Sequence, residues 1–188
     1  LFRLLVGDPI TYREEEGWDI AETKRNEEIN QLISSANLLQ INEWFERFNK
    51  IASQHILIED WKFGHFKGFL KKLSEVKPDV ADNLLKMSFK KNSSLMHFTG
   101  GFLDGFRIGA HFKYWDKYVG RIVDIKNIEL VNALIYSLNI YGEVDLEKYI
   151  RNSDLELLGK IVKQKGKFSF LKKTDNLMLH HAIINTLT

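Results

Sequence analysis

The chain has 188 residues, of which 44% are hydrophobic and 28% are charged, a balance typical of a folded protein rather than a disordered one. The absence of cysteine excludes a disulfide framework and any thiolate metal site, and it favours a reducing compartment, the cytoplasm. The formal net charge is only +2, and no apolar run approaches the ~20 residues of a membrane-spanning helix. We therefore expect residues 1–188 to form a single cytoplasmic domain that does not enter a membrane.

Residues 1–19 form an opening segment whose structure the sequence does not define. An apolar stretch over 1–6 is followed by a Gly-Asp-Pro turn signal at 7–9 and by three consecutive glutamates at 14–16. These residues do not show the basic, apolar and small-residue regions of a signal peptide. The other end of the chain follows directly on an apolar helical pattern, without the polar terminal unit that a stacked helical array needs. We therefore expect these residues to be a piece of a longer polypeptide.

Helical periodicity governs the next sixty residues. Apolar residues three and four positions apart predict a helix from Ala21 to about Asn37, and residues 38–52 carry the clearest amphipathic stripe. A third helix is predicted over 59–77, with Val76 among its inward residues. It ends before Pro78, because proline lacks the amide hydrogen and disfavours helix at the residue before it.

The rest of the chain continues this pattern of helices joined by short polar turns. Asp79 suits the first turn of the helix after Pro78, and Ser93 or Ser94 could cap the one that follows. Further helices are predicted over 95–109, 112–124, 126–141, 146–150, 154–165 and 174–187. Strand-like alternation is nearly absent, so the chain is predicted to be all-α.

Three short stretches are similar to one another at a spacing of 33 and 32 residues. They are residues 68–73 (GFLKKL), 101–106 (GFLDGF) and 133–138 (ALIYSL). Such a period is the length of one helix–turn–helix unit, and units of this kind bury their apolar faces by stacking. The small residue that begins each stretch (Gly68, Gly101 or Ala133) is expected to allow a neighbouring helix to approach closely.

Over about residues 59–150 this pattern resembles helical-repeat solenoids of the HEAT-like kind. The resemblance implies stacked antiparallel helix pairs, an α-solenoid, with a concave surface for a protein partner. The paired alanines and terminal proline of tetratricopeptide repeats do not recur, so the peptide-carboxylate clamp of that family is not carried over. Residues 157–161 (LLGKI) and 180–183 (HHAI) are also similar to the terminal helical region of large bacterial phage-defence proteins that carry a SIR2-type domain. That likeness implies a sensing or scaffolding segment, with the chemistry in another part of the chain.

The sequence predicts no catalytic site, cofactor or metal. The zinc motif HExxH, the nucleophile motif GxSxG and the phosphate loop GxxxxGK[ST] are all missing. His65 and His97 fall at near-equivalent repeat positions and could approach each other. Asp104 lies three residues before Arg107, and a local salt bridge is favoured over a catalytic role.

Two sets of residues are candidates for binding. In the helix over 112–124, Phe112 and Tyr114 fall off the predicted buried face, so we expect both to be exposed and, with Lys117, to contact a protein partner. Residues 151–175 hold seven basic and three acidic side chains, a net charge of +4, whereas residues 1–30 hold four basic and eight acidic, −4. The alternative is therefore nucleic-acid binding by a lysine-rich segment, with Phe168 and Phe170 stacking on bases. Its lysines are Lys160, Lys163, Lys165, Lys167, Lys172 and Lys173.

The interpretation favoured by the sequence is a helical scaffold or protein-interaction module, a non-catalytic part of a larger multidomain protein. Its partner would be another protein or other domains of its own chain.

Overall fold

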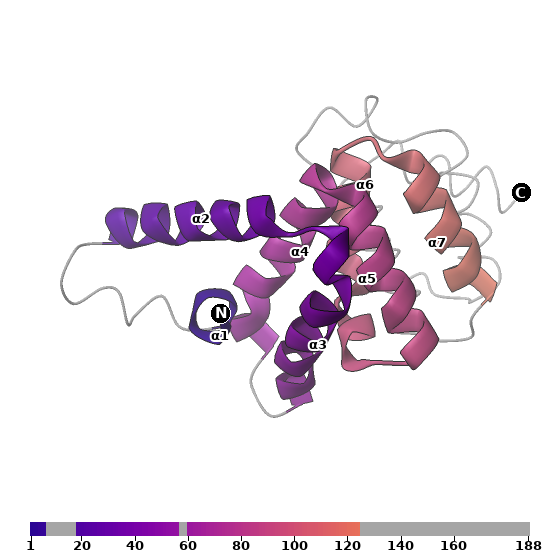
Figure 1. The fold of residues 1–188 in the computed structure, drawn as a ribbon, viewed down its shortest axis with the longest axis horizontal. Helices are drawn as coiled ribbons and strands as arrows, with labels where there is room; N and C mark the ends of the chain where they lie inside the picture. The colour runs from indigo at the N-terminus through magenta and orange to yellow at the C-terminus, as the bar shows by residue number, and fades with distance from the viewer. Residues whose placement is uncertain (7–17, 57–59, 125–188) are drawn as a thin grey trace, which may run out of the picture. The chain divides into compact units, whose positions relative to one another are not determined.

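The computed structural model describes residues 1–6, 18–56 and 60–124, and all their regular structure is helical (Figure 1). α-Helices alternate with short 3-10 helices, and these ranges contain no strand. The all-α prediction is thus confirmed for them. The helices predicted over 126–141, 146–150, 154–165 and 174–187 lie outside the described residues. Within the described ranges, no helix has both the length and the apolar character needed to cross a bilayer.

The chain divides into two compact units, Leu1–Asp116 and Lys117–Thr188. The boundary falls inside a helix that is continuous over Phe112–Asp124, so the first unit ends in the first turns of that helix. Of the second unit, the structure describes the remaining turns of the same helix. The single domain expected from the sequence stays a prediction.

The first half of the described chain is built around one strongly amphipathic helix. Its elements are α1 (Phe2–Leu5), α2 (Trp18–Ser35), η2 (Leu38–Gln40), α3 (Ile41–Ala52) and η3 (Ser53–Ile56). Asn37 separates α2 from η2, as predicted, because its Oδ1 accepts a hydrogen bond from the Gln40 amide at 3.2 Å. The stripe predicted over 38–52 is real in α3, whose Trp44, Phe45 and Phe48 are buried.

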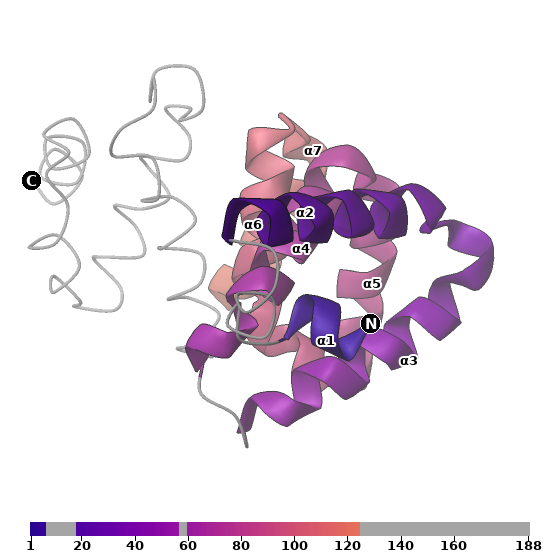
Figure 2. The ribbon, with the colours of Figure 1, turned by 90° about the vertical axis from the view of Figure 1, so that its left-hand side faces the viewer.

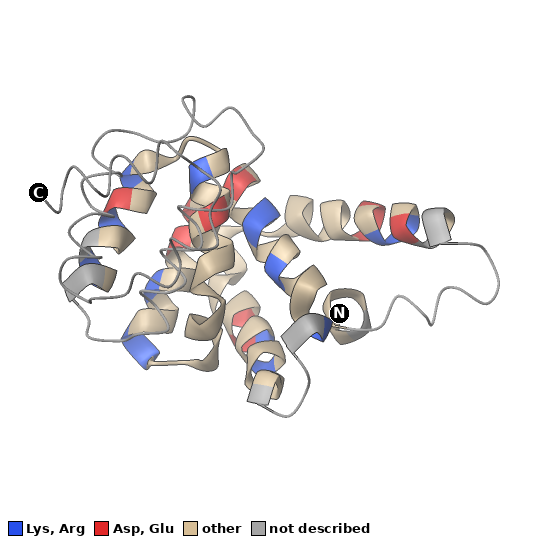
Figure 3. Ribbon diagram, turned by 180° about the vertical axis from the view of Figure 1, so that it is seen from behind, with Lys and Arg blue, Asp and Glu red and all other residues tan. Residues whose placement is uncertain are grey.

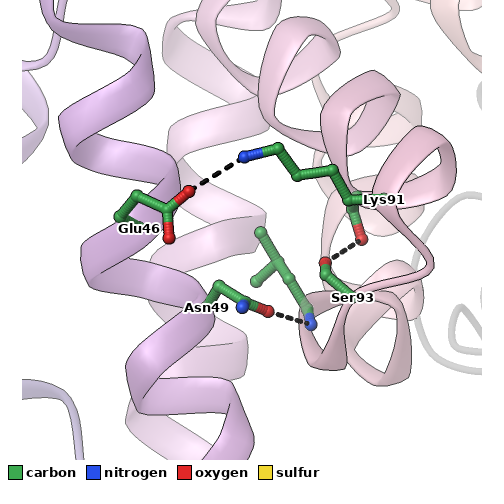
Figure 4. Close-up of polar contacts among 6 residues, drawn as sticks. Glu46, Asn49, Lys91 and Ser93 are labelled. Atoms are coloured by element: carbon green, nitrogen blue, oxygen red, sulfur yellow. Dashed lines mark hydrogen bonds and ion pairs between the residues drawn. The ribbon is translucent and has the colours of Figure 1, made fainter.

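The second half turns sharply at Pro78. Its elements are η4 (Asp60–Phe63), α4 (Gly64–Val76), α5 (Pro78–Lys91), η5 (Ser94–Phe98), α6 (Thr99–Ile108) and α7 (Phe112–Asp124). Proline takes the first position of α5 and Asp79 its first turn, which confirms both expectations. Ser93 precedes η5 without capping it, because its hydroxyl donates to the Ser88 hydroxyl at 3.2 Å (Figure 4).

Aromatic side chains from α3, α4 and η5 form the centre of the core. Phe48 lies 5.1 Å from Phe69 between ring centroids, and Phe66 lies 4.8 Å from Phe98 in an edge-to-face arrangement. Such pairs add about 0.5–1.5 kcal/mol to the burial of the rings. The inward prediction for Val76 is wrong: it is the last residue of α4 and is 52% exposed, three positions beyond the buried Leu73.

Helices α4 and α6 approach until backbone meets backbone. A Cβ added to Gly101 would lie 3.0 Å from the Lys67 carbonyl oxygen, and one added to Gly105 would lie 2.0 Å from that of Lys71. The expected close approach is confirmed at Gly101. It is wrong at Gly68, where an added Cβ would meet nothing within 4 Å, because this glycine is on the exposed side of α4.

Hydrogen bonds between side chains and backbone groups, and one ion pair, connect helices that are distant in the sequence. Lys77, between α4 and α5, donates from Nζ to the carbonyl oxygens of Ser34 (2.6 Å) and Ala36 (2.7 Å) at the end of α2. Asn49 of α3 accepts from the Leu95 amide at 3.3 Å, beside an ion pair of Lys91 with Glu46 at 2.9 Å (Figure 4). These contacts join segments more than forty residues apart in the chain.

Candidate partner-binding groove

A groove of about 540 Å³ in the first unit is lined by residues of both α1 and α3. Figure 2 shows α1 in front of α3, and α1 packs against α4 and α2. The groove is lined mainly by apolar surface, from Leu1 and Phe2 on α1 and from Ile51 on α3. Leu1 and Phe2 are 43% and 41% exposed, whereas Ile51 is only 4% exposed and forms the floor. A concave, mostly apolar site of this size with a few polar groups is the usual form of a binding site.

The polar members of the groove come from α3 and from η3, the 3-10 helix that follows it. Arg47 and Lys50 lie on α3 and Gln54 lies on η3, at three- and four-residue spacing with Ile51 among them. Two of these side chains are cationic, and the lining contains no carboxylate. Elsewhere on the described helices acidic and basic residues are interspersed (Figure 3). The groove therefore joins an apolar floor to a positively charged wall.

The two cations of the wall differ in their surroundings. Arg47 forms an ion pair with Glu43, one turn earlier on α3, and its guanidinium carbon lies 6.0 Å from the centroid of the Trp44 ring. Lys50 is exposed, and its ammonium makes no hydrogen bond or ion pair with any residue in the described ranges. Of the two, Lys50 is the cation that can meet an incoming anion without giving up an internal contact.

The structure corrects the exposure expected for one predicted binding residue. Tyr114 is 8% exposed: its ring stacks on Phe106 at 5.4 Å between centroids, and its hydroxyl donates to Asp79. A long aromatic side chain set at the margin of an apolar stripe can lie back onto the core while its hydroxyl reaches a polar partner. Phe112 is half-buried, and Lys117 is exposed. Tyr114 thus offers little surface to a partner.

The nucleic-acid alternative concerns a different part of the chain. Lys160, Lys163, Lys165, Lys167, Lys172 and Lys173 all lie outside the described residues, as do the segments similar to phage-defence proteins. Both interpretations stay predictions.

Arg107 is enclosed beside the α4–α6 contact, and Asp104 is half-buried there. Burial raises the pKa of the Asp104 carboxyl to about 7, although the charges of Lys71 and Arg107 pull it down. Its Oδ1 has no hydrogen-bond partner among the described residues. Arg107 is fully buried, with its guanidinium carbon 4.6 Å from the centroid of the Trp115 ring. This pair does not line the groove of α1 and α3.

The histidines pair differently from the expectation. His65 contacts Arg25, with 2.7 Å between Nε2 and Nη1, while His97 stacks on His55 at 5.8 Å between ring centroids. Burial and then the Arg25 charge lower the pKa of His65, against an opposing effect of Glu22. The searched part of the chain holds no cluster of three or more His, Asp or Glu side chains able to bind a metal ion.

The sequence analysis did not predict the groove, although it identified the two apolar segments that line it. The apolar stretch over 1–6 and the stripe containing Ile51 were each apparent, but nothing in the sequence shows that the two line one groove. The available signal is at the end of α3: Lys50 on α3 and Gln54 on η3 are four residues apart, next to the apolar stripe.

Comparisons of the chain with protein-family models, curated proteins and solved structures gave no match. The function must therefore be argued from the groove itself.

Proposed function

We propose that this chain is a helical protein-interaction module and that the α1–α3 groove receives apolar side chains of a partner protein. The single observation that carries the proposal is the apolar groove of about 540 Å³ beside exposed Leu1 and Phe2. Exposed apolar side chains next to a concavity are typical of surfaces that bind another protein.

The arrangement of α4 and α6 supports the finer proposal of a stacked helical array. These helices have the most extensive mutual contact among the described elements, although α5 and η5 separate them in the chain. In a solenoid each helix packs against its equivalent in the next unit, and α4 and α6 contain the first two of the three similar stretches. An array of this kind would hold the groove on a rigid frame.

Selection from a display library of random linear peptides, followed by NMR titration of the selected peptides, tests the proposed function. We expect amide shift changes concentrated on α1 and α3. Phe2→Ser should weaken binding about tenfold, since an exposed apolar residue at a binding site contributes about 1–2 kcal/mol. Leu39→Ser is the matched control, because Leu39 is 98% exposed and lies outside the groove.

Two results would contradict the proposed function. One is the selection of no peptide that binds the folded protein. The other is a set of peptides whose binding is lost with Leu39→Ser and kept with Phe2→Ser, because that result would move the binding surface from the groove to the α2–α3 corner.

The nucleic-acid alternative is tested separately by titration of single-stranded and duplex oligonucleotides. If the lysines over 160–173 bind phosphates, affinity falls steeply with salt and is lost on their replacement by glutamine. Undetectable binding at low salt would eliminate this alternative.

A further inference from the structure

We infer that the α1–α3 groove selects an acidic segment of its partner, an apolar anchor flanked by Asp or Glu, and that Lys50 reads the carboxylate. This inference rests on the proposed function and adds the chemistry of the partner. It identifies one residue that decides specificity.

The charge of the groove lining favours an anionic ligand. Arg47 and Lys50 are the only charged side chains of the lining, and both are cationic. An anion placed in the groove is therefore attracted from the α3 side, whereas a basic segment is repelled. Because both cations are exposed to solvent, this attraction is screened by added salt.

The two cations of the groove differ in whether they already have an ion-pair partner. The Arg47 guanidinium is already paired with Glu43, so its charge is partly neutralised before any ligand arrives. The Lys50 ammonium has no hydrogen bond or ion pair within the described part of the chain. Lys50 can therefore gain a carboxylate without losing an internal partner.

The position of Gln54 completes the recognition surface. Gln54 lies one helical turn after Lys50, lines the same groove and makes no side-chain hydrogen bond within the described ranges. An ammonium and an amide so placed present several donors above the Ile51 floor. A carboxylate next to an apolar side chain satisfies both parts of this surface at once.

Three synthetic peptides that share one apolar core test the inference on the full chain. The core is flanked by glutamate in the first, by glutamine in the second and by lysine in the third. We expect the glutamate peptide to bind about tenfold more tightly than the glutamine peptide, the lysine peptide to bind most weakly, and the difference to shrink with added salt.

Substitution of Lys50 assigns the preference to one residue. Lys50→Met keeps the aliphatic stem and should reduce the glutamate preference about fivefold, whereas Lys50→Glu should invert it in favour of the lysine peptide. Lys86→Glu is the control, because Lys86 is also exposed but lies on α5, outside the groove. Circular dichroism and thermal unfolding check that each variant folds. Lys50→Gln is used in place of a Lys50 variant that does not fold.

The outcomes separate this inference from the proposed function. Equal binding of the three peptides, with an NMR footprint on α1 and α3, would overturn the acidic preference and leave the groove intact. Unchanged preference in Lys50→Met and Lys50→Glu would overturn the role of Lys50. Failure of all three peptides and of the display library would overturn the proposed function itself.

Discussion

Helix α4 packs against α6 on one side and against α2 on another. The first contact is made by backbone atoms at glycines, and the second by polar and charged side chains. Against α6, α4 presents its own backbone, because Gly101 and Gly105 leave room for direct approach to the carbonyls of Lys67 and Lys71. Against α2 it presents His65, whose ring meets the Arg25 guanidinium. At the end of α4, Lys77 reaches across to the last carbonyls of α2.

The comparison teaches that the two contacts should fail for different reasons. The α4–α6 contact tolerates no added volume, since there is no space between the backbones. The α2 contact depends on charges and hydrogen bonds, and in Figure 1 α2 extends away from the other helices of the first unit. We therefore expect the first contact to respond to steric change and the second to respond to acid.

The largest loss of folding stability is expected from Gly105→Ala. Its new methyl group would lie 2.0 Å from the Lys71 carbonyl oxygen and 2.5 Å from the Ser74 Cβ, so the two helices must separate. Overpacking of this kind costs about 3 kcal/mol. Denaturant unfolding should show the loss as a lower midpoint.

Gly68→Ala is the matched control for that prediction. Gly68 is an exposed glycine inside α4 with no atom within 4 Å of an added Cβ. Alanine has the higher helix propensity, so the free energy of unfolding should rise by about 0.5–1 kcal/mol. A loss of stability in Gly68→Ala, or none in Gly105→Ala, would contradict the described contact.

The next effect on stability concerns the half-buried carboxyl of Asp104, beside the α4–α6 contact. The pKa of Asp104 is raised from 3.8 to about 7, so between these values the folded protein keeps a proton that the unfolded chain loses. Stability should therefore fall as pH rises from about 4 to about 7. Asp104→Asn should remove this pH dependence. Near pH 8 its free energy of unfolding should be about 2 kcal/mol higher than that of the parent protein. Urea unfolding across that range measures both, and parallel curves for the two proteins would refute the prediction.

A smaller effect is expected from Lys77→Met. The substitution removes two hydrogen bonds of 2.6 and 2.7 Å from the end of α2 and keeps much of the side-chain volume. Partly exposed hydrogen bonds from an ammonium to neutral carbonyl oxygens contribute about 1 kcal/mol together. Hydrogen exchange should accelerate in the last turn of α2, and Lys86→Met, an exposed lysine on α5, should leave it unchanged.

The smallest effect concerns the acid response of the α2 contact. The pKa of His65 is lowered by burial and by the Arg25 charge, so the unfolded chain takes up a proton before the folded protein does. Stability from this contact should be lost as pH falls below about 6.5, opposite in sign to the effect of Asp104. NMR titration of the His65 ring should give a depressed pKa that rises in Arg25→Met. A pKa at or above the ordinary histidine value would contradict the contact.

The sequence predicted individual helices better than it predicted their neighbours. It located the turn at Pro78 and the helix over 112–124, because proline geometry and helical periodicity are local properties. It treated Gly68 and Gly101 as equivalent, although one is exposed and the other touches α4. Periodicity identifies the apolar face of a helix, but it does not show how far a neighbouring helix covers the margins of that face.

The same limit explains Tyr114 and the groove. Tyr114 falls off the apolar stripe by angle, yet Phe106 and Asp79 from other helices enclose it. Phe2 and Lys50 were visible as an apolar residue and a charged one, but their common groove depends on how the segments that carry them pack in the first unit.

The amino-acid order by itself determined the helical class of the described residues, most of their buried side chains and the places where helices stop, since these follow from propensity and spacing along one segment. Tertiary structure alone decided which glycine meets a backbone, which histidine meets an arginine and where an apolar concavity stays open. Those properties depend on distances between segments far apart in the chain, and such distances are set by packing the whole unit together.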